Sequence, residues 1–171
     1  MTILIRPADP ADAPALADAL ARNRAAMRPW EPRRADAYYT AEEQYARLTA
    51  PNSRMWLACH EEDVVGCATL SGIALGPFRS AFLGYWVDAA HTGRGLATRI
   101  VAEVCRAARE ELGLHRIEAA TVLANAASQR VLAKGGFERI GTAPAYLHID
   151  GAWRDHHLYQ RILHNDPPPQ A

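Results

Sequence analysis

Lysine is nearly absent from this 171-residue chain: Lys134 is the only one, and all other basic residues apart from histidines are arginines. Lys+Arg and Asp+Glu each number 19, so the formal net charge is zero. Without an excess of positive charge, the chain lacks the broad electrostatic footprint of a nucleic-acid-binding protein. Arg33-Arg34 is too short a basic run to change this, and we interpret it as part of a solvated face.

Cysteines and long apolar runs are also scarce. The cysteines number three, no Cys-x-x-Cys pair occurs, and each lies in an apolar stretch, which indicates buried thiols in a reducing cytoplasm. No apolar run reaches the length of a membrane span. The first residues lack the basic region and apolar segment of a secretory signal. We therefore expect a cytoplasmic protein without a membrane segment.

Metal ligands are poorly represented. His148, His156 and His157 are close in sequence, but no cysteine is near them, and adjacent histidines in a strand point to opposite faces. We therefore predict no metal site.

The most informative stretch runs from Phe82 to Leu112. Its apolar start, Phe82–Val87, is typical of a strand, and Leu96, Ile100, Val104 and Ala108 then recur at helical spacing until Gly113 follows. Between them lies the glycine-bearing turn Thr92-Gly93-Arg94-Gly95-Leu96-Ala97. This order predicts a strand, a turn and an amphipathic helix.

Such a turn can bind phosphate. A helix start leaves backbone N–H groups without intrahelical partners and carries a partial positive charge. Gly93 and Gly95 allow positive φ and a close approach to the amides, and Arg94 adds a positive charge. Neither a Walker A lysine nor the third glycine of a dinucleotide fingerprint follows. The alternative is a tight turn that only links two elements.

The remaining patterns predict one mixed α/β domain over residues 1–163 and a disordered, proline-rich tail over 164–171. The expected strands are Thr2–Arg6, Met55–His60, Val64–Leu75, Phe82–Val87, Arg116–Val122, Ala143–Ile149 and Ala152–Leu163. The expected helices follow Asp9 as far as Asn23, run from Thr40 to Leu48, fill Leu96–Leu112 and span Ala126–Lys134. Asp150-Gly151 predicts a hairpin.

Taken together, these residues resemble the GNAT superfamily of acyl-CoA-dependent N-acetyltransferases, over about Ile3 to Ile162. In that family a motif Arg/Gln-x-x-Gly-x-Gly/Ala holds the pyrophosphate of coenzyme A, and Thr92 to Ala97 match it except that Thr92 replaces Arg or Gln. Asn125-Ala126-Ala127-Ser128, followed by Gly136-Phe137, matches a second motif that closes the cofactor site. Leu4-Ile5-Arg6-Pro7, Arg28-Pro29-Trp30 and Gly84-Tyr85-Trp86-Val87 further resemble the branch that acetylates the amino termini of ribosomal proteins.

The resemblance implies a mostly antiparallel sheet of about seven strands, about four helices, and a parallel central pair that splays apart after its start. Pantetheine would lie in the splay, and acetyl-CoA would be the acetyl donor. The implied cofactor-binding residues are Trp86, Val87, Thr92, Gly93, Arg94, Gly95, Leu96, Ala97, Asn125 and Ser128.

For catalysis, the resemblance implies a backbone N–H near Val87 that polarises the thioester carbonyl. Many relatives use a helix tyrosine as proton donor, but this chain has Leu132 there. We consider Ser128 the substitute, or else a serine bonded to a carbonyl of its own helix. Glu118 is the candidate base, or else a structural partner of Arg116 or Arg139.

Trp30 and Tyr146 are candidates for the wall of the acceptor cleft, with core packing as the alternative for both. The predicted activity is acetylation of a primary amine, and we favour a protein or peptide amino terminus as the acceptor. The alternatives are a small-molecule amine, antibiotics included, or a non-catalytic acyl-CoA-binding module. A nucleotide phosphatase would need a lysine and acidic metal ligands that the turn lacks. A homodimer is one assembly left open.

Overall fold

The computed structural model describes residues 2–168. Within them the strands are β1 (Leu4–Pro7), β2 (Ser53–His60), β3 (Asp63–Ala74), β4 (Ser80–Val87), β5 (Arg116–Val122), β6 (Glu138–Ile149) and β7 (Ala152–Ile162). The α-helices are α1 (Ala13–Met27), α2 (Ala41–Leu48), α3 (Leu96–Glu110) and α4 (Ala126–Lys134), and the 3-10 helices are η1 (Pro10–Asp12), η2 (Asp36–Tyr39) and η3 (Ala89–His91). No helix in this part of the chain is long and apolar enough to span a membrane.

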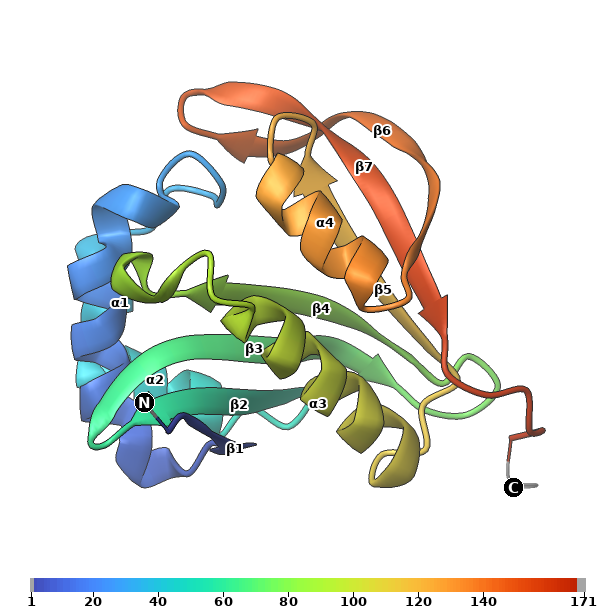
Figure 1. Ribbon diagram of the computed structural model, residues 1–171, viewed down its shortest axis with the longest axis horizontal. Helices are drawn as coiled ribbons and strands as arrows, with labels where there is room; N and C mark the ends of the chain where they lie inside the picture. Colours follow the sequence, from blue (N-terminus) through green and yellow to red (C-terminus); the bar gives the residue numbers. More distant parts are fainter. Residues whose placement is uncertain (1, 169–171) are drawn as a thin grey trace.

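All seven strands form one sheet in the order β1-β2-β3-β4-β5-β7-β6. Every neighbouring pair is antiparallel except β4 and β5, which are parallel and connected through α3. Figure 1 shows these two strands close together near their starts and farther apart toward their ends. The predicted mixed, mostly antiparallel sheet with a splayed central pair is therefore confirmed.

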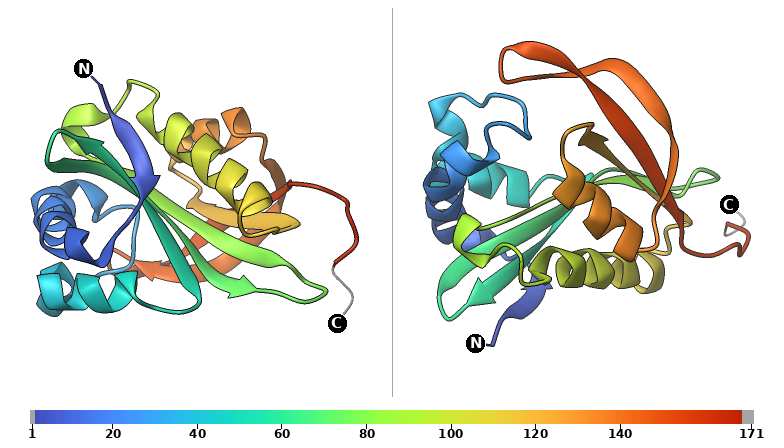
Figure 2. Two further views of the ribbon diagram at one scale, coloured as in Figure 1. Left: turned by 90° about the horizontal axis from the view of Figure 1, so that it is seen from below. Right: turned by 45° about the horizontal axis from the view of Figure 1, so that its top comes forward.

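Helices cover both faces of the sheet, as the views in Figures 1 and 2 show. On one face, Leu16 and Leu20 of α1 pack on Leu57 of β2 in an apolar cluster that Leu48 of α2 borders. On the other face, α3 and α4 contribute to a larger cluster that includes Ile100 and Leu132. Burial of apolar side chains on both faces of the central strands stabilises this three-layer arrangement.

Polar side chains define several helix starts, as the sequence predicts. Asp9 Oδ1 accepts a hydrogen bond from the Ala11 N–H at 2.8 Å, and Thr40 Oγ1 accepts one from the Glu43 N–H at 3.3 Å. Asn125 Oδ1 likewise accepts from the Ser128 N–H at 3.0 Å. Each bond satisfies an amide that has no partner within its helix.

Several predicted boundaries differ from the observed ones by one or two residues, and two differ by four or more. The first helix continues to Met27, because Asn23 is buried and its side chain makes hydrogen bonds inside the protein instead of ending the helix. β6 begins at Glu138 and not at Ala143, because two register shifts interrupt the alternation that marks a strand. Of the predicted tail, residues 164–168 form no helix or strand, and 169–171 lie outside the described residues, as does Met1.

Candidate active site

A gap opens between β4 and β5 in the middle of the sheet. Their pairing comprises only Ser80 with Arg116, Ala81 with Ile117, and Phe82 with Glu118. Beyond Phe82, β4 remains paired with β3 as far as Val87, and β5 remains paired with β7 over its whole length. The five residues from Leu83 to Val87 therefore present about 16 Å of strand edge that no neighbouring strand covers.

The main-chain groups of alternate β4 residues point into this gap. The Asp88 N–H donates to the Val65 carbonyl at 2.9 Å, which makes these two a hydrogen-bonded pair of the β3–β4 ladder. Hydrogen-bonded pairs alternate with non-bonded pairs along an antiparallel ladder. The main-chain N–H and C=O groups of Val87 and Tyr85 therefore face away from β3 and toward β5. An extended ligand in the gap could pair with them as an added strand does.

The amino terminus of α3 follows the end of β4. Gly93 and Gly95 have φ of 74° and 75°, and Gly95 occupies the N-cap position without a side-chain cap. The first helical bond runs from the Arg99 N–H to the Gly95 carbonyl, at 3.1 Å. The space that a Cβ atom would occupy on either glycine is empty to 4 Å. The turn thus forms an open cradle of amides suited to an anion.

The other predicted cofactor residues surround this cradle in different ways. Arg94 is exposed and has no ion pair among residues 2–168. The Thr92 hydroxyl instead donates to the Ala89 carbonyl at 3.0 Å, so it stabilises its own loop. Leu96 is a buried core residue, Ala97 is half-buried, and Trp86 packs against the cluster beneath α1.

Ser128 lies in the first turn of α4, next to the cap Asn125. Its hydroxyl is 2.7 Å from the Tyr85 hydroxyl, which is also 3.2 Å from the Ser128 carbonyl oxygen. Burial raises the pKa of Tyr85 to about 12, and the hydrogen bond with Ser128 acts in the opposite direction. The Ser128 side chain therefore bonds across the fold to β4, instead of to a carbonyl of its own helix.

Glu118 lies at the closed end of the gap, opposite Phe82. Its carboxylate forms an ion pair with Arg116, one of the two arginines expected as structural partners. The side chain is still 37% exposed. Because Ile117 and Ala119 belong to the cluster under α3 and α4, the alternating Glu118 lies on the face that α1 covers.

Trp30 and Tyr146 are not core residues: they are 44% and 38% exposed. The core-packing alternative is therefore wrong for both. Trp30 follows the end of α1, and Tyr146 lies on β6 with its ring 5.2 Å from that of His156. Arg28 Nε, just before Trp30, contacts Asp150 Oδ1 of the β6–β7 turn at 2.8 Å, which links the two segments.

Three residues in the site region were not predicted. Tyr85 and Thr121 lie on β4 and β5 beside the gap, and Asp88 anchors the loop that leads to the glycine turn. Tyr85 could have been found from strand periodicity, because it is two residues before Val87 and so shares its face. Nothing in the sequence indicates that the Thr121 hydroxyl is buried without a partner among the described residues.

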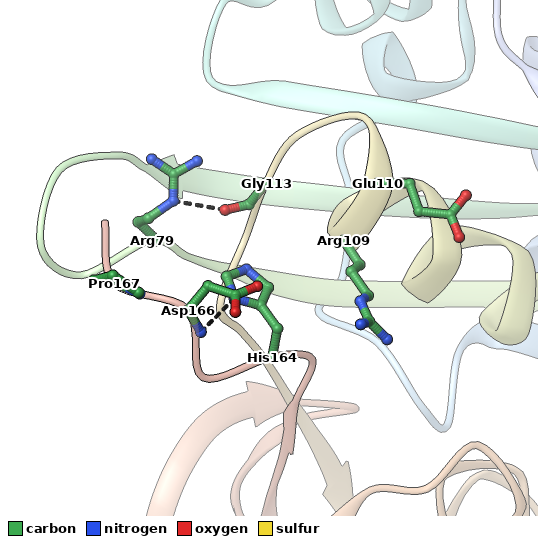
Figure 3. Close-up of a pocket in the computed structure, with 7 residues that line it drawn as sticks. All are labelled: Arg79, Arg109, Glu110, Gly113, His164, Asp166 and Pro167. Atoms are coloured by element: carbon green, nitrogen blue, oxygen red, sulfur yellow. Dashed lines mark hydrogen bonds and ion pairs between the residues drawn. The ribbon is translucent and has the colours of Figure 1, made fainter. Parts of the chain in front are cut away.

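A cavity of about 320 Å³ lies where α3 ends (Figure 3). Its lining includes Arg79, Arg109 and His164. The Arg79 Nε already donates to the Gly113 carbonyl at 2.6 Å and so closes the carboxyl end of α3. We interpret the cavity as part of that helix end. The candidate site is the gap between β4 and β5 with the amide cradle beside it.

Comparison with known proteins agrees with this geometry. Residues 2–138 match the model of the acetyltransferase (GNAT) domain. The probable N-acetyltransferase YjcK of Bacillus subtilis is 36% identical over 166 residues, with 92% of each chain covered. The structure of ribosomal-protein-S5-alanine acetyltransferase from Vibrio fischeri superposes with a TM-score of 0.92 at 32% identity, covering 99% of this chain and 97% of that one. RimJ of Mycobacterium smegmatis, in complex with CoA-disulfide, gives 0.85 at 30% identity over 94% and 81%.

Proposed function

Because the chain belongs to the GNAT acetyltransferase family, we propose that this enzyme transfers the acetyl group of acetyl-CoA to a primary amine, with a protein or peptide amino terminus as the acceptor. The observation that carries the proposal is the gap between β4 and β5 with the uncapped start of α3 beside it. The gap presents main-chain donors and acceptors that pair with no strand. The start of α3 presents N–H groups that can bind an anion.

The binding residues divide between the two parts of the cofactor. The amides at the start of α3, together with Arg94, would hold the diphosphate, and the open space at Gly93 and Gly95 leaves room for it. The Val87 carbonyl and the main-chain groups of Tyr85 would bond the pantetheine amides. When bound, acetyl-CoA supplies an activated acyl group as a thioester.

Two side chains are assigned to proton movement. Ser128 would donate a hydrogen bond to the departing sulfur. Glu118, opposite Phe82 and so about 16 Å of strand from Val87, would accept the proton of the acceptor amine through water molecules. The Val87 N–H, directed into the gap, would polarise the acyl carbonyl. Glu118 and Ser128 lie on opposite faces of the sheet, which suits an amine that approaches from the α1 side.

The acceptor would lie between the loop after α1 and the β6–β7 hairpin. Trp30 and Tyr146 place exposed aromatic rings there, and the Arg28–Asp150 ion pair connects the two walls. Exposed aromatic rings suit contact with an extended chain terminus. The similarity to a ribosomal-protein-S5-alanine acetyltransferase supports a protein amino terminus, and a ribosomal acceptor would locate the activity in the cytoplasm.

The test measures thiol release from acetyl-CoA with a panel of acceptors. The panel contains peptides that begin with alanine or serine, the same peptides with a blocked amino terminus, and small amines that include aminoglycosides. Turnover that requires the free peptide amine supports the proposal. Turnover on small amines alone would reassign the acceptor, and CoA binding without turnover on any acceptor would indicate a non-catalytic acyl-CoA-binding module.

A further inference from the structure

Tyr85 connects the two sides of the gap. Its main-chain groups face the gap from β4, while its ring packs against the cluster under α3 and α4. The hydroxyl reaches the first turn of α4, 2.7 Å from Ser128 Oγ. Tyr85 thus contributes main-chain groups to the gap. Its side chain contacts Ser128, the residue that we assign to the departing sulfur.

Thr121 is a second polar residue at this level of the gap. The paired residues of β4 and β5 differ by 36 in number, as Phe82 and Glu118 do, so Thr121 is the register position opposite Tyr85. Both side chains lie on the face that α3 and α4 cover, because Leu83 and Ala119 of the same alternation belong to that cluster. Thr121 is 3% exposed, and its hydroxyl has no hydrogen-bond partner among residues 2–168.

A buried hydroxyl without a partner is costly, so such groups call for a ligand or a water molecule. The strands that carry Thr121 and Tyr85 are no longer paired with each other at this level. Tyr85, which bonds Ser128 of α4, and Thr121 thus occupy the same register level on the same face of the sheet.

We propose that Tyr85 is a positioning residue for catalysis. Its phenol lies within hydrogen-bond distance of both the Ser128 carbonyl oxygen and Ser128 Oγ, and with cofactor bound it donates to Oγ, so that the Ser128 hydroxyl hydrogen is free to meet the thioester sulfur. This inference rests on the proposed function. The phenol keeps its proton at neutral pH, because the ordinary pKa of tyrosine lies well above 7 and burial raises it further. A hydroxyl that accepts one hydrogen bond becomes a stronger donor in the next.

The proton balance needs no further reactant. As the carbon–sulfur bond breaks, its electron pair moves to sulfur, which receives a proton through Ser128. The carbon–nitrogen bond forms at the same carbon, and the amine loses one proton to Glu118 or water. The Ser128 hydroxyl regains its proton from solvent, and Tyr85 remains protonated throughout.

The test uses Tyr85→Phe, which keeps the packed ring and removes only the hydroxyl. We expect kcat to fall about 10- to 100-fold. The KM for acetyl-CoA and the calorimetric affinity for CoA should change less than about threefold, because the hydroxyl positions Ser128 and does not hold the cofactor. Tyr45→Phe, which removes a phenol from exposed α2, is the matched control and should leave kcat unchanged.

A second comparison separates positioning from packing. If Tyr85 acts through Ser128, the double variant Tyr85→Phe/Ser128→Ala should be no slower than Ser128→Ala alone. Additive losses, a parallel loss of CoA affinity, or Tyr85→Phe turnover within about twofold of the wild type would each overturn the inference. Absence of wild-type turnover on every acceptor would reject the proposed function itself, whereas equal turnover of wild type and Tyr85→Phe rejects this inference alone.

Discussion

Asn23 Nδ2 donates a hydrogen bond to Asp88 Oδ2 at 2.9 Å and so joins α1 to the end of β4 through the interior. The side-chain oxygen of the same residue, Asn23 Oδ1, accepts a hydrogen bond from the Ala89 N–H, also at 2.9 Å. Asp88 is 5% exposed and also accepts from Arg22 Nε and the Ala90 N–H. This network fixes the loop from which the glycine turn starts.

Replacing Asn23 with alanine should therefore destabilise the protein. Asn23→Ala removes a donor from Asp88 and an acceptor from Ala89, and unsatisfied buried groups cost about 1–3 kcal/mol each. We expect urea unfolding at pH 7 to show a loss of at least about 1 kcal/mol. Asp18→Ala, on the exposed side of the same helix, is the control and should stay within about 0.5 kcal/mol of the wild type. Equal effects would contradict a role for the buried bond.

Stability should also fall in acid. Burial of Asp88 would raise its pKa, but the hydrogen bonds from Asn23, Ala90 and Arg22 outweigh it and hold the pKa below its usual value. The pKa of Asp12 is also lowered, by its hydrogen bond from Arg6. A carboxyl group whose pKa is lower in the folded than in the unfolded protein stabilises the fold at pH values above its unfolded-state pKa of about 3.9. This stabilisation is lost as the pH falls through the folded-state pKa.

Unfolding free energies from urea titrations at pH 7, 5, 4 and 3 would measure this loss. They should change little between pH 7 and 5 and then decline below about pH 4. Asp88→Asn should be less stable than the wild type at pH 7 and lose less on acidification. An unchanged acid slope in that variant would show that Asp88 does not carry the effect.

Two glycines provide a matched test of the diphosphate cradle. Gly95 and Gly76 share a φ of 75° and empty surroundings, but only Gly95 caps α3. Gly95→Ala and Gly76→Ala should each lose about 1–2 kcal/mol of stability, because alanine is strained at positive φ. Only Gly95→Ala, and more strongly Gly95→Val, should weaken CoA binding in calorimetry, because the added carbon atoms enter the anion space. Unchanged affinity in both Gly95 variants would contradict the placement of the site.

Glu118 and Arg116 can be separated by parallel substitutions. If the carboxylate takes the proton of the amine, Glu118→Gln should lower kcat at pH 7 by about 10²-fold or more. Arg116→Gln breaks the same ion pair but keeps the carboxylate, so its kcat should remain within about threefold of the wild type. Equal losses in the two variants would assign the effect to the ion pair instead of to the base.

Local sequence signals determined most of the fold. The glycine turn before Leu96, the cap Asn125 and the Asp150-Gly151 hairpin each restrict a few neighbouring dihedral angles, so they can be recognised without knowledge of the rest of the chain. The bounds of α2, α4 and β5 follow from such signals. Signals of this kind failed where a long-range contact took precedence, as at Asn23.

The tertiary structure alone decided which distant side chains meet. Strand periodicity assigns Tyr85 to a face, but only the packing of α4 on that face brings it to Ser128, 43 residues away. The sequence offered two arginines as partners for Glu118, and the fold selected Arg116. The physical reason is that backbone preferences act over a few residues, whereas side-chain contacts depend on how whole elements pack to bury their apolar faces.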